Sequence, residues 1–304
     1  MILAVDNGFH MTKTSTGLRF YSTIRKGEDV INKESMQIKV NGESYIVGES
    51  DGEYISDADK LTSESSKTNL IMCTLAAIGM SHPNEKFIDV ILAVGTPVSL
   101  FSKQKDDLKK LMENLPTEFY INKVGHNQTL KISNVIVYPQ GIATVFKNYK
   151  AIQDTNSMVI DVGGGSVDVS EFDGLKVTNK ATYFDGMLPL YEKISQYLNS
   201  NYYTNFSADQ IYKLIERKYF TVMGDKVSMD VIDHIIESHV QELMTKINRS
   251  FSIRNVDNLY LTGGGAKQLL LHIQKYVPNI QLEQDAQFSN ATGYEYMTKI
   301  KMER

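Results

Sequence analysis

Short apolar runs that end in glycine recur along this chain, and they determine the fold that we predict. Ile2–Val5 leads into an aspartate, an asparagine and a glycine, Met158–Ile160 into an aspartate and three glycines, and Asn258–Leu261 into a threonine and three glycines. Runs of this length that are rich in β-branched residues predict buried strands. Because the carboxyl ends of such strands can meet at one edge of a sheet, the three turns can converge on one ligand.

The segments between these runs predict helices and hairpins. Apolar residues at helical spacing predict helices over 67–80, 99–114, 187–198, 207–218, 228–254, 266–276 and 289–302. Further strands are predicted over 11–15, 18–24, 36–40, 43–47, 87–94, 117–124, 129–137 and 280–283. Asn41-Gly42 and Asp173-Gly174 are typical hairpin turns. The mixture indicates an α/β fold of two similar halves that face a common cleft and cross near residues 150–156.

The central turn carries the strongest chemical signal. Gly163–Gly165 lack side chains, so backbone N–H groups there can close around a phosphate. Asp161 and Asp168 on either side are acceptors that suit a hydrated magnesium ion. Lys13, close to the first turn, can direct its ammonium group at a phosphate, and Gln140 follows a strand that stops at a proline. A glycine-rich hairpin with solvated carboxylates and a solvated lysine is the alternative interpretation.

Length and charge restrict the classes of protein. At 304 residues and 34.3 kDa the chain is long enough for two domains. A net charge of −4 and a pI near 5.9 argue against direct binding of nucleic acid. The single cysteine, Cys73, excludes an intrachain disulfide, and the six histidines show no metal-ligand spacing. A strand directly at the N-terminus and the lack of a long apolar run lead us to expect a cytoplasmic protein without a membrane segment.

Five segments in a fixed order resemble the superfamily of actin, sugar kinases and chaperone ATPases. Residues 6–13 and 161–168 resemble the two phosphate loops of that superfamily, and residues 261–266 resemble its adenosine segment. Residues 138–143 and 290–294 resemble its two connecting segments. Each glycine motif is weak alone, and the resemblance rests on their order over nearly the whole chain. Less specific cues at Val47–Glu49 and Ala93–Pro97 are most similar to the ParM-type bacterial and archaeal actins.

This resemblance implies two domains with a nucleotide in the cleft between them. Domain I is expected over residues 1–153, with a C-terminal helix over 289–304 packing back on it, and domain II over residues 154–288. The cofactors implied are ATP, with GTP left open, and Mg²⁺. Asp6 and Asp161 would hold magnesium through waters, and Gln140, Asp161 and Asp168 would be the catalytic residues.

The resemblance also assigns nucleotide contacts. The phosphate-binding residues implied are Asn7, Gly8, Lys13, Gly163, Gly164, Gly165 and Ser166, and those beside the adenosine are Gly263, Gly264, Gly265 and Ala266. Lys213 and Glu216 resemble the segment that contacts ribose and base, although a solvated helix face is an equal alternative. Phe9 and His10 depart from actin, which has small residues there.

Three functions follow from these patterns. The ParM resemblance implies an ATPase that polymerises with copies of itself into dynamic filaments and segregates plasmid DNA. Its partner would be a DNA-binding adaptor of the ParR type on a centromere-like site, which accords with the lack of a basic surface. The alternatives are a small-molecule kinase of the same fold and a nucleotide-gated regulator that does not polymerise. Gln140, where a kinase generally has an aspartate base, favours hydrolysis over transfer to an alcohol.

Overall fold

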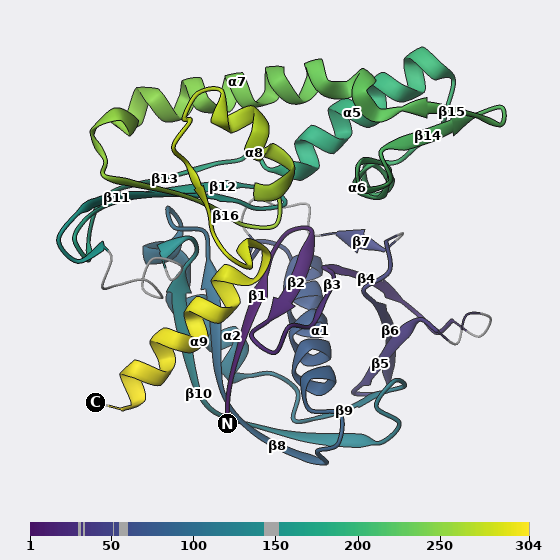
Figure 1. The fold of residues 1–304 in the computed structure, drawn as a ribbon. Helices are drawn as coiled ribbons and strands as arrows, with labels where there is room; N and C mark the ends of the chain where they lie inside the picture. Colours follow the sequence, from purple (N-terminus) through teal and green to yellow (C-terminus); the bar gives the residue numbers. More distant parts are fainter. Residues whose placement is uncertain (30–31, 33, 51, 55–59, 143–151, 304) are drawn as a thin grey trace.

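The chain forms two lobes, each built on its own sheet (Figure 1). The structure is a computed structural model that describes residues 1–29, 32, 34–50, 52–54, 60–142 and 152–303. We call lobe I the sheet of strands β1–β10 with helices α1, α2 and α9, and lobe II the sheet that contains β11–β13, with helices α5–α8. The predicted α/β two-lobed fold is confirmed. The predicted boundary between residues 153 and 154 lies close to residues 143–151, which are outside the described ranges, and it stays a prediction.

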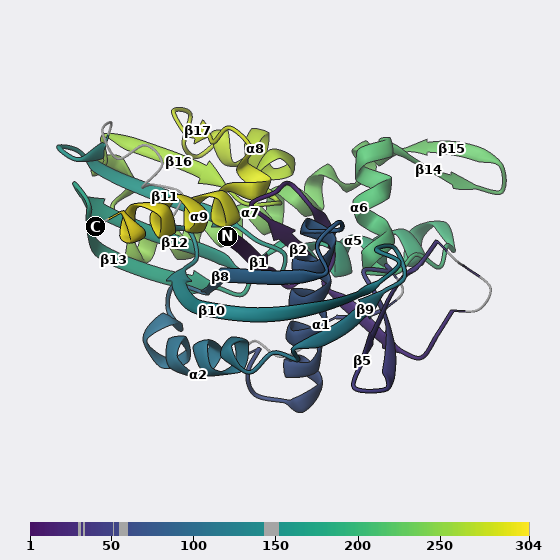
Figure 2. The ribbon, with the colours of Figure 1, turned by 90° about the horizontal axis from the view of Figure 1, so that it is seen from below.

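Lobe I is a mixed sheet in the order β3-β2-β1-β8-β10-β9-β5-β6-β4-β7. Its strands are β1 (Ile2–Asn7), β2 (Met11–Thr14), β3 (Arg19–Tyr21), β4 (Thr23–Lys26), β5 (Met36–Val40), β6 (Glu43–Val47), β7 (Glu53–Tyr54), β8 (Phe87–Thr96), β9 (Glu118–Ile121) and β10 (Asn127–Pro139). Its helices are α1 (Glu64–Ser81), α2 (Phe101–Glu113) and α9 (Ser289–Met302). In β1 the alternation of side chains sends Leu3 and Val5 into the core with α1, and Ala4 into the core with α9. Figure 2 shows α1 and α2 on one face of the sheet and α9 on the other.

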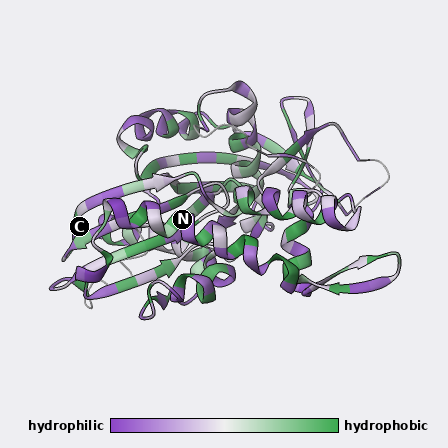
Figure 3. Cartoon of the chain, turned by 90° about the horizontal axis from the view of Figure 1, so that it is seen from above, coloured by the Kyte–Doolittle hydropathy of each residue, from purple (hydrophilic) through white to green (hydrophobic). Residues whose placement is uncertain are grey.

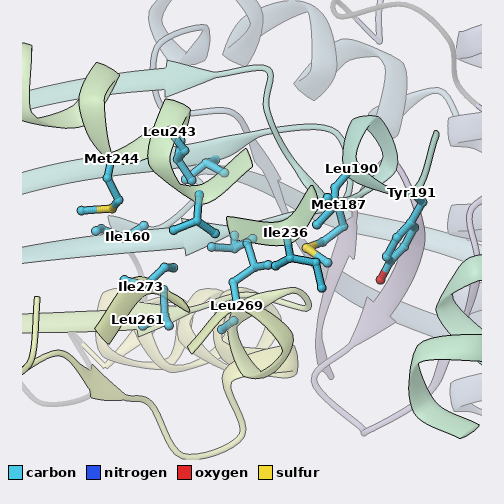
Figure 4. Packing of buried hydrophobic residues seen from close by; sticks show 14 of the residues in the cluster. Ile160, Met187, Leu190, Tyr191, Ile236, Leu243, Met244, Leu261, Leu269 and Ile273 are labelled. Carbon is cyan, nitrogen blue, oxygen red and sulfur yellow. The ribbon is translucent and has the colours of Figure 1, made fainter. Parts of the chain in front are cut away.

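Lobe II has a smaller sheet in the order β13-β12-β11-β16-β17 and a separate hairpin. Its strands are β11 (Asn156–Val162), β12 (Val167–Asp173), β13 (Lys176–Tyr183), β16 (Asn258–Thr262) and β17 (Gln281–Leu282), and the hairpin is β14 (Tyr219–Val222) with β15 (Asp225–Ser228). Its helices are α5 (Met187–Tyr202), α6 (Ala208–Arg217), α7 (Asp233–Ser250) and α8 (Ala266–Gln274), with 3₁₀ turns at Met229–Ile232, Ile253–Asn255 and Ala286–Phe288. Figure 4 shows how Ile160 and Leu261 of the sheet pack against Leu243 and Leu269 of the helices.

The helices of lobe II each bury apolar side chains in the core that also contains the inward side chains of its sheet. Coloured by hydropathy, they show hydrophobic and hydrophilic stretches in turn (Figure 3). Helix α7 buries Ile236, Val240 and Leu243, residues that recur at helical spacing. Among the described residues, no helix is long and apolar enough to cross a membrane.

Two predicted elements differ from the structure, and one hairpin of the structure was not predicted. The strand predicted over 18–24 is two strands, because the chain changes partner at Ser22: β3 pairs with β2, whereas β4 pairs with β6 and β7. The helix predicted over 228–254 begins later, at Asp233, after a 3₁₀ turn that Ser228 caps. It ends at Ser250, where Phe251 becomes extended and turns into the core of lobe II. The hairpin β14–β15 was not predicted.

Helix α9 ties the end of the chain to lobe I. Tyr294 is fully buried and stacks on Tyr138 of β10, with ring centroids 5.6 Å apart and an interplanar angle of 11°. The hydroxyl groups of Tyr138 and Thr298 share a hydrogen bond of 3.0 Å. The start of α9 therefore lies at the junction of the lobes, where the strand–glycine turns also meet.

Candidate functional site

A cavity between the lobes collects the three strand–glycine turns. It lies at the ends of the strands of both lobes and is lined by polar and charged side chains beside the glycine turns. Of the residues predicted to bind or react, the following line it: Asp6, Gly8, Lys13, Gln140, Asp161, Gly163, Gly164, Ser166, Asp168, Gly263, Gly264 and Gly265. The convergence predicted from the sequence is therefore present, with residues from β1 and β2 of lobe I opposite residues from β11, β12 and β16 of lobe II.

Asp6 organises the lobe I side of this cavity. One of its carboxylate oxygens, Oδ2, lies 3.3 Å from Lys13 Nζ, on the paired strand β2. The other, Oδ1, accepts a hydrogen bond of 3.1 Å from Nε2 of Gln140. All three side chains are buried, so these charge-assisted contacts are little screened by solvent and fix each other's orientation.

Asp161 and Asp168 form the lobe II side. Asp161 accepts a hydrogen bond of 2.8 Å from Asn290 Nδ2. The side-chain oxygen of Asn290, Oδ1, in turn accepts one of 2.9 Å from the backbone N–H of Gly141. Asp168 accepts bonds from the backbone N–H of Val98 and from the hydroxyl of Thr182. Both carboxylates are therefore held by donors from other segments.

Burial raises the pKa of both carboxyl groups. The pKa of Asp161 rises to about 6 and that of Asp168 to about 7, chiefly because the buried charge loses its hydration. Nearby negative charge, from Asp6 on Asp161 and from Asp161 on Asp168, raises them further. The cavity thus holds three carboxyl groups, and Lys13 by itself neutralises only part of their negative charge.

The glycine turn of lobe II presents a backbone donor to the cavity. The carbonyls of Gly163, Gly164 and Gly165 accept hydrogen bonds from the N–H groups of Met187, Leu188 and Gly186 at the start of α5. The N–H of Gly163 bonds across the turn to Ser166. No described residue accepts a hydrogen bond from the N–H of Gly164, which lines the cavity, and this donor suits an anion; Gly165, also a predicted phosphate contact, packs against Phe9 and does not line the cavity.

Some predicted contacts lie elsewhere. The N–H of Gly8 bonds to the carbonyl of Met11, and the side chain of Asn7 turns into lobe I, where it bonds Thr74 and Thr12. Ala266 is buried at the start of α8 and does not line the cavity. This placement does not favour a direct contact of a ligand with Asn7 or Ala266. Ala143, in the predicted first connecting segment, lies outside the described residues.

A second, more open pocket continues from the first. Glu216 lines it, together with Gly263, Gly264 and Lys267. Arg19 of lobe I reaches across to donate a hydrogen bond of 2.6 Å to Gln287, just before α9. Lys213, which was predicted to act with Glu216, is exposed and does not line either pocket.

The sequence did not reveal Lys60. Its side chain is almost fully buried, its ammonium group donates a hydrogen bond to the carbonyl of Asn7, and it lies 4.2 Å from the centre of the Phe9 ring. Burial lowers the pKa of Lys60 to about 8, although Asp6 and Asp168 raise it. No motif marks this lysine, because only the folded chain brings it beneath the first turn.

Two family profiles match successive parts of the chain. The family described as "Actin like proteins N terminal domain" matches residues 4–142, and the one described as "Plasmid segregation protein ParM, C-terminal" matches residues 152–297. The chain belongs to the ParM-type actin-like proteins. Sequence comparison with curated proteins gave no match.

Solved structures of other actin-like proteins share the fold of this ParM-type protein. A 15-stranded ParM filament from Clostridium botulinum superposes with a TM-score of 0.82 at 21% identity, covering 98% of this chain and 99% of that one. Ta0583, an archaeal actin homolog in complex with ADP, gives 0.81 at 18% identity with the same coverage. Apo pSK41 ParM gives 0.71 at 20% identity, covering 100% and 99%. At these identities the likeness concerns the fold.

Proposed function

We propose that this ParM-type protein binds and hydrolyses ATP in the cavity between its lobes and that it polymerises into filaments. The observation that carries the proposal is the convergence of three strand–glycine turns, with Asp6, Lys13 and Gln140 facing Asp161 and Asp168. The ADP complex of the archaeal homolog, which has the same fold, supports a nucleotide as the ligand.

The free backbone donor and Lys13 define the phosphate end of the site. The N–H group of Gly164 and the ammonium group of Lys13 are positive partners from the two lobes. A triphosphate between them would bring the lobes together, because each lobe supplies part of its binding energy. The second pocket, with Glu216 and Lys267, would take the ribose and base.

The carboxylates fit a magnesium ion. Burial raises the pKa of Asp161 and Asp168, and a cation beside them would favour their ionised forms. No group of three His, Cys, Asp or Glu side chains in the described residues is arranged to hold a metal alone, and magnesium characteristically takes one or two carboxylates with waters and phosphates. Asp6 and Asp161 would hold it, and it would neutralise charge on the phosphates.

Gln140 would orient the attacking water. Its Nε2 is committed to Asp6, which leaves the carbonyl oxygen of the side chain as the acceptor for a water proton. A neutral amide orients water but is a poor base, so we expect slow hydrolysis. Asp168, held by Val98 and Thr182, would assist the same water or the magnesium.

Membership of the family supports the proposals that this protein forms a filament and that the filament moves plasmid DNA. One structure with this fold is a ParM filament, and the C-terminal profile is that of a plasmid segregation protein. We therefore propose that this protein segregates plasmid DNA through a DNA-binding adaptor of the ParR type, since a pI near 5.9 disfavours direct contact with DNA.

Sedimentation with magnesium and ATP, ADP, GTP or no nucleotide, alongside phosphate release, tests this function. Pelleting with ATP that reverses as phosphate appears is the expected result. If the protein hydrolyses ATP but stays in the supernatant at all concentrations, polymerisation is wrong and the nucleotide site stands. ADP release stimulated by one member of a sugar panel would instead identify a kinase.

A further inference from the structure

The turn that follows Asp6 inserts two bulky side chains between the lobes. A Cβ atom built on Gly164 would lie 2.5 Å from Cβ of His10, and one on Gly165 would lie 2.7 Å from the ring of Phe9. Both distances are shorter than real contacts allow. The turn of lobe I therefore packs directly on the glycine turn of lobe II, and glycine is required there for this approach.

The ring of His10 lies in a cage of four tyrosines, which we call the tyrosine cage. Tyr21 and Tyr54 come from lobe I, with ring centroids 5.4 and 5.8 Å from that of His10. Tyr191 of α5 and Tyr212 of α6 come from lobe II, each at 5.9 Å in edge-on geometry. One imidazole thus joins both lobes through aromatic contacts, each of which stabilises by about 0.5–1.5 kcal/mol.

The tyrosine cage suits an uncharged imidazole. His10 is 7% exposed, and its Nε2 is buried with no hydrogen-bond partner among the described residues. A protonated ring would carry an N–H donor at that atom without an acceptor, which is costly in a buried place. The hydroxyl of Tyr54 is buried and unpartnered as well, whereas that of Tyr191 donates to Gln268.

We propose that His10 is a positioning residue that closes the two lobes over the nucleotide site, and that it does so only as the neutral imidazole. The inference rests on the proposed function, since it assumes that closure favours nucleotide binding. It adds a residue that the superfamily motifs do not contain, on the turn that also carries the phosphate contacts.

The direction of the pH effect follows from the surroundings of His10. Burial, and to a smaller extent the charge of Lys13, lower its pKa from 6.5 to about 4, against the opposing effect of Asp209 of α6. Glu216 and Arg19 act on the neighbouring Tyr212. An open form would expose the ring and restore its ordinary pKa, so protons favour the open form. The contribution of His10 to closure is then fully present above about pH 7 and is lost as the pH falls through 6.5. At pH 5.5 the equilibrium constant for closure should be lower by roughly tenfold.

The test compares His10→Phe with the wild type and with His234→Phe. His234 is a matched control, because its ring also meets a tyrosine edge-on, Tyr197 at 5.0 Å, but within lobe II. The dissociation constant of ATP with magnesium is measured from pH 5.5 to 8.0, at protein concentrations below assembly. His10→Leu, which is also uncharged, is measured alongside in case the larger ring is not accommodated.

Affinity of the wild type should fall by roughly tenfold more between pH 8.0 and 5.5 than that of His10→Phe or His10→Leu. His234→Phe should follow the wild type, which would show that loss of another histidine is not the cause, and the His10 variants keep Asp161 and Asp168, so their difference from the wild type reports on His10. Equal pH dependence in all four proteins overturns the role of His10 while the nucleotide site stands. If the wild type does not bind ATP at any pH, the proposed function fails. Small-angle scattering without nucleotide then still tests the closure by His10. It should show expansion at pH 5.5 in the proteins that keep His10 and no expansion in the His10 variants.

Discussion

The side chain of Gln140 is hydrogen-bonded to that of Asp6, 134 residues earlier, with 3.1 Å between Nε2 and Oδ1. This bond joins the end of β10 to the end of β1 at the floor of the cavity. It fixes which atom of the amide is left for water, since the nitrogen is already engaged. A residue that is fixed in this way orients a water without moving during the reaction.

Gln140→Ala is therefore expected to slow ATP hydrolysis about 100-fold and to leave ATP affinity within a few fold of the wild type. The measurement is single-turnover phosphate release with a parallel binding titration. Gln287→Ala is the control, since Gln287 also lines the cavity but bonds Arg19 away from the carboxylates. Equal losses of hydrolysis in both variants would contradict an orienting role.

Asp168→Asn should stabilise the protein without nucleotide while it abolishes most hydrolysis. The wild-type pKa of about 7 lies above the ordinary 3.8, so the native state binds the extra proton and its stability falls as the pH rises from 4 to 7. The amide keeps an acceptor for Val98 and Thr182 but carries no buried charge. Thermal unfolding should show a gain of about 1–4 kcal/mol above pH 7 that shrinks toward pH 4. A gain independent of pH would mean that ionisation of Asp168 is not the cause.

Gly164→Ala should force the lobes apart. The added Cβ would meet the backbone and Cβ of His10, whereas the equivalent atom in Gly264→Ala meets only Lys13 Nζ, at an ordinary 3.8 Å. Overpacking of this kind costs about 1–3 kcal/mol if the lobes stay closed. Small-angle scattering without nucleotide should give a larger radius of gyration for Gly164→Ala alone. The prediction fails if the two variants are equally compact.

Tyr294→Phe and Tyr138→Phe should change stability in opposite directions, although the two rings are stacked. The hydroxyl of Tyr294 is buried and has no hydrogen-bond partner in the part of the chain that the structure describes, so its removal should stabilise by about 1 kcal/mol. The hydroxyl of Tyr138 bonds Thr298, so its removal should destabilise by a similar amount. Urea denaturation of both variants and the wild type gives the comparison, and destabilisation by Tyr294→Phe would indicate an unseen partner.

Local signals predicted much of the fold. Asn41-Gly42 forms the expected hairpin with both residues at positive φ, and the strands before Asp6 and Asp161 lie where the apolar runs ended. The sequence pattern does not predict the hairpin β14–β15, because its turn is Met223-Gly224 and methionine is rare at positive φ. The sequence supplied the turn residues of the site because their chemistry is local.

The sequence could not supply the contacts that join distant segments. Lys60 lies beneath Phe9, Asn290 bonds Asp161, and His10 meets Tyr212 only after the lobes have packed. Several of these residues lie in the motif segments, but no motif states which of them meet, because each pair is far apart in the sequence. Conversely, Lys213 looked equivalent to Glu216 on a helix, and both are exposed, but only Glu216 lines the second pocket. Helical spacing identifies a face, and the tertiary structure decides what that face meets.

The packing of α9 on β1 has a consequence for synthesis on the ribosome. β1 is made long before α9, yet one of its faces packs against that helix. The strands of the second lobe all lie between residues 156 and 282, so that lobe can complete its sheet before α9 has been made. The lobe that is begun earlier is thus finished later, and until α9 packs on β1 the exposed face of that strand needs protection from aggregation.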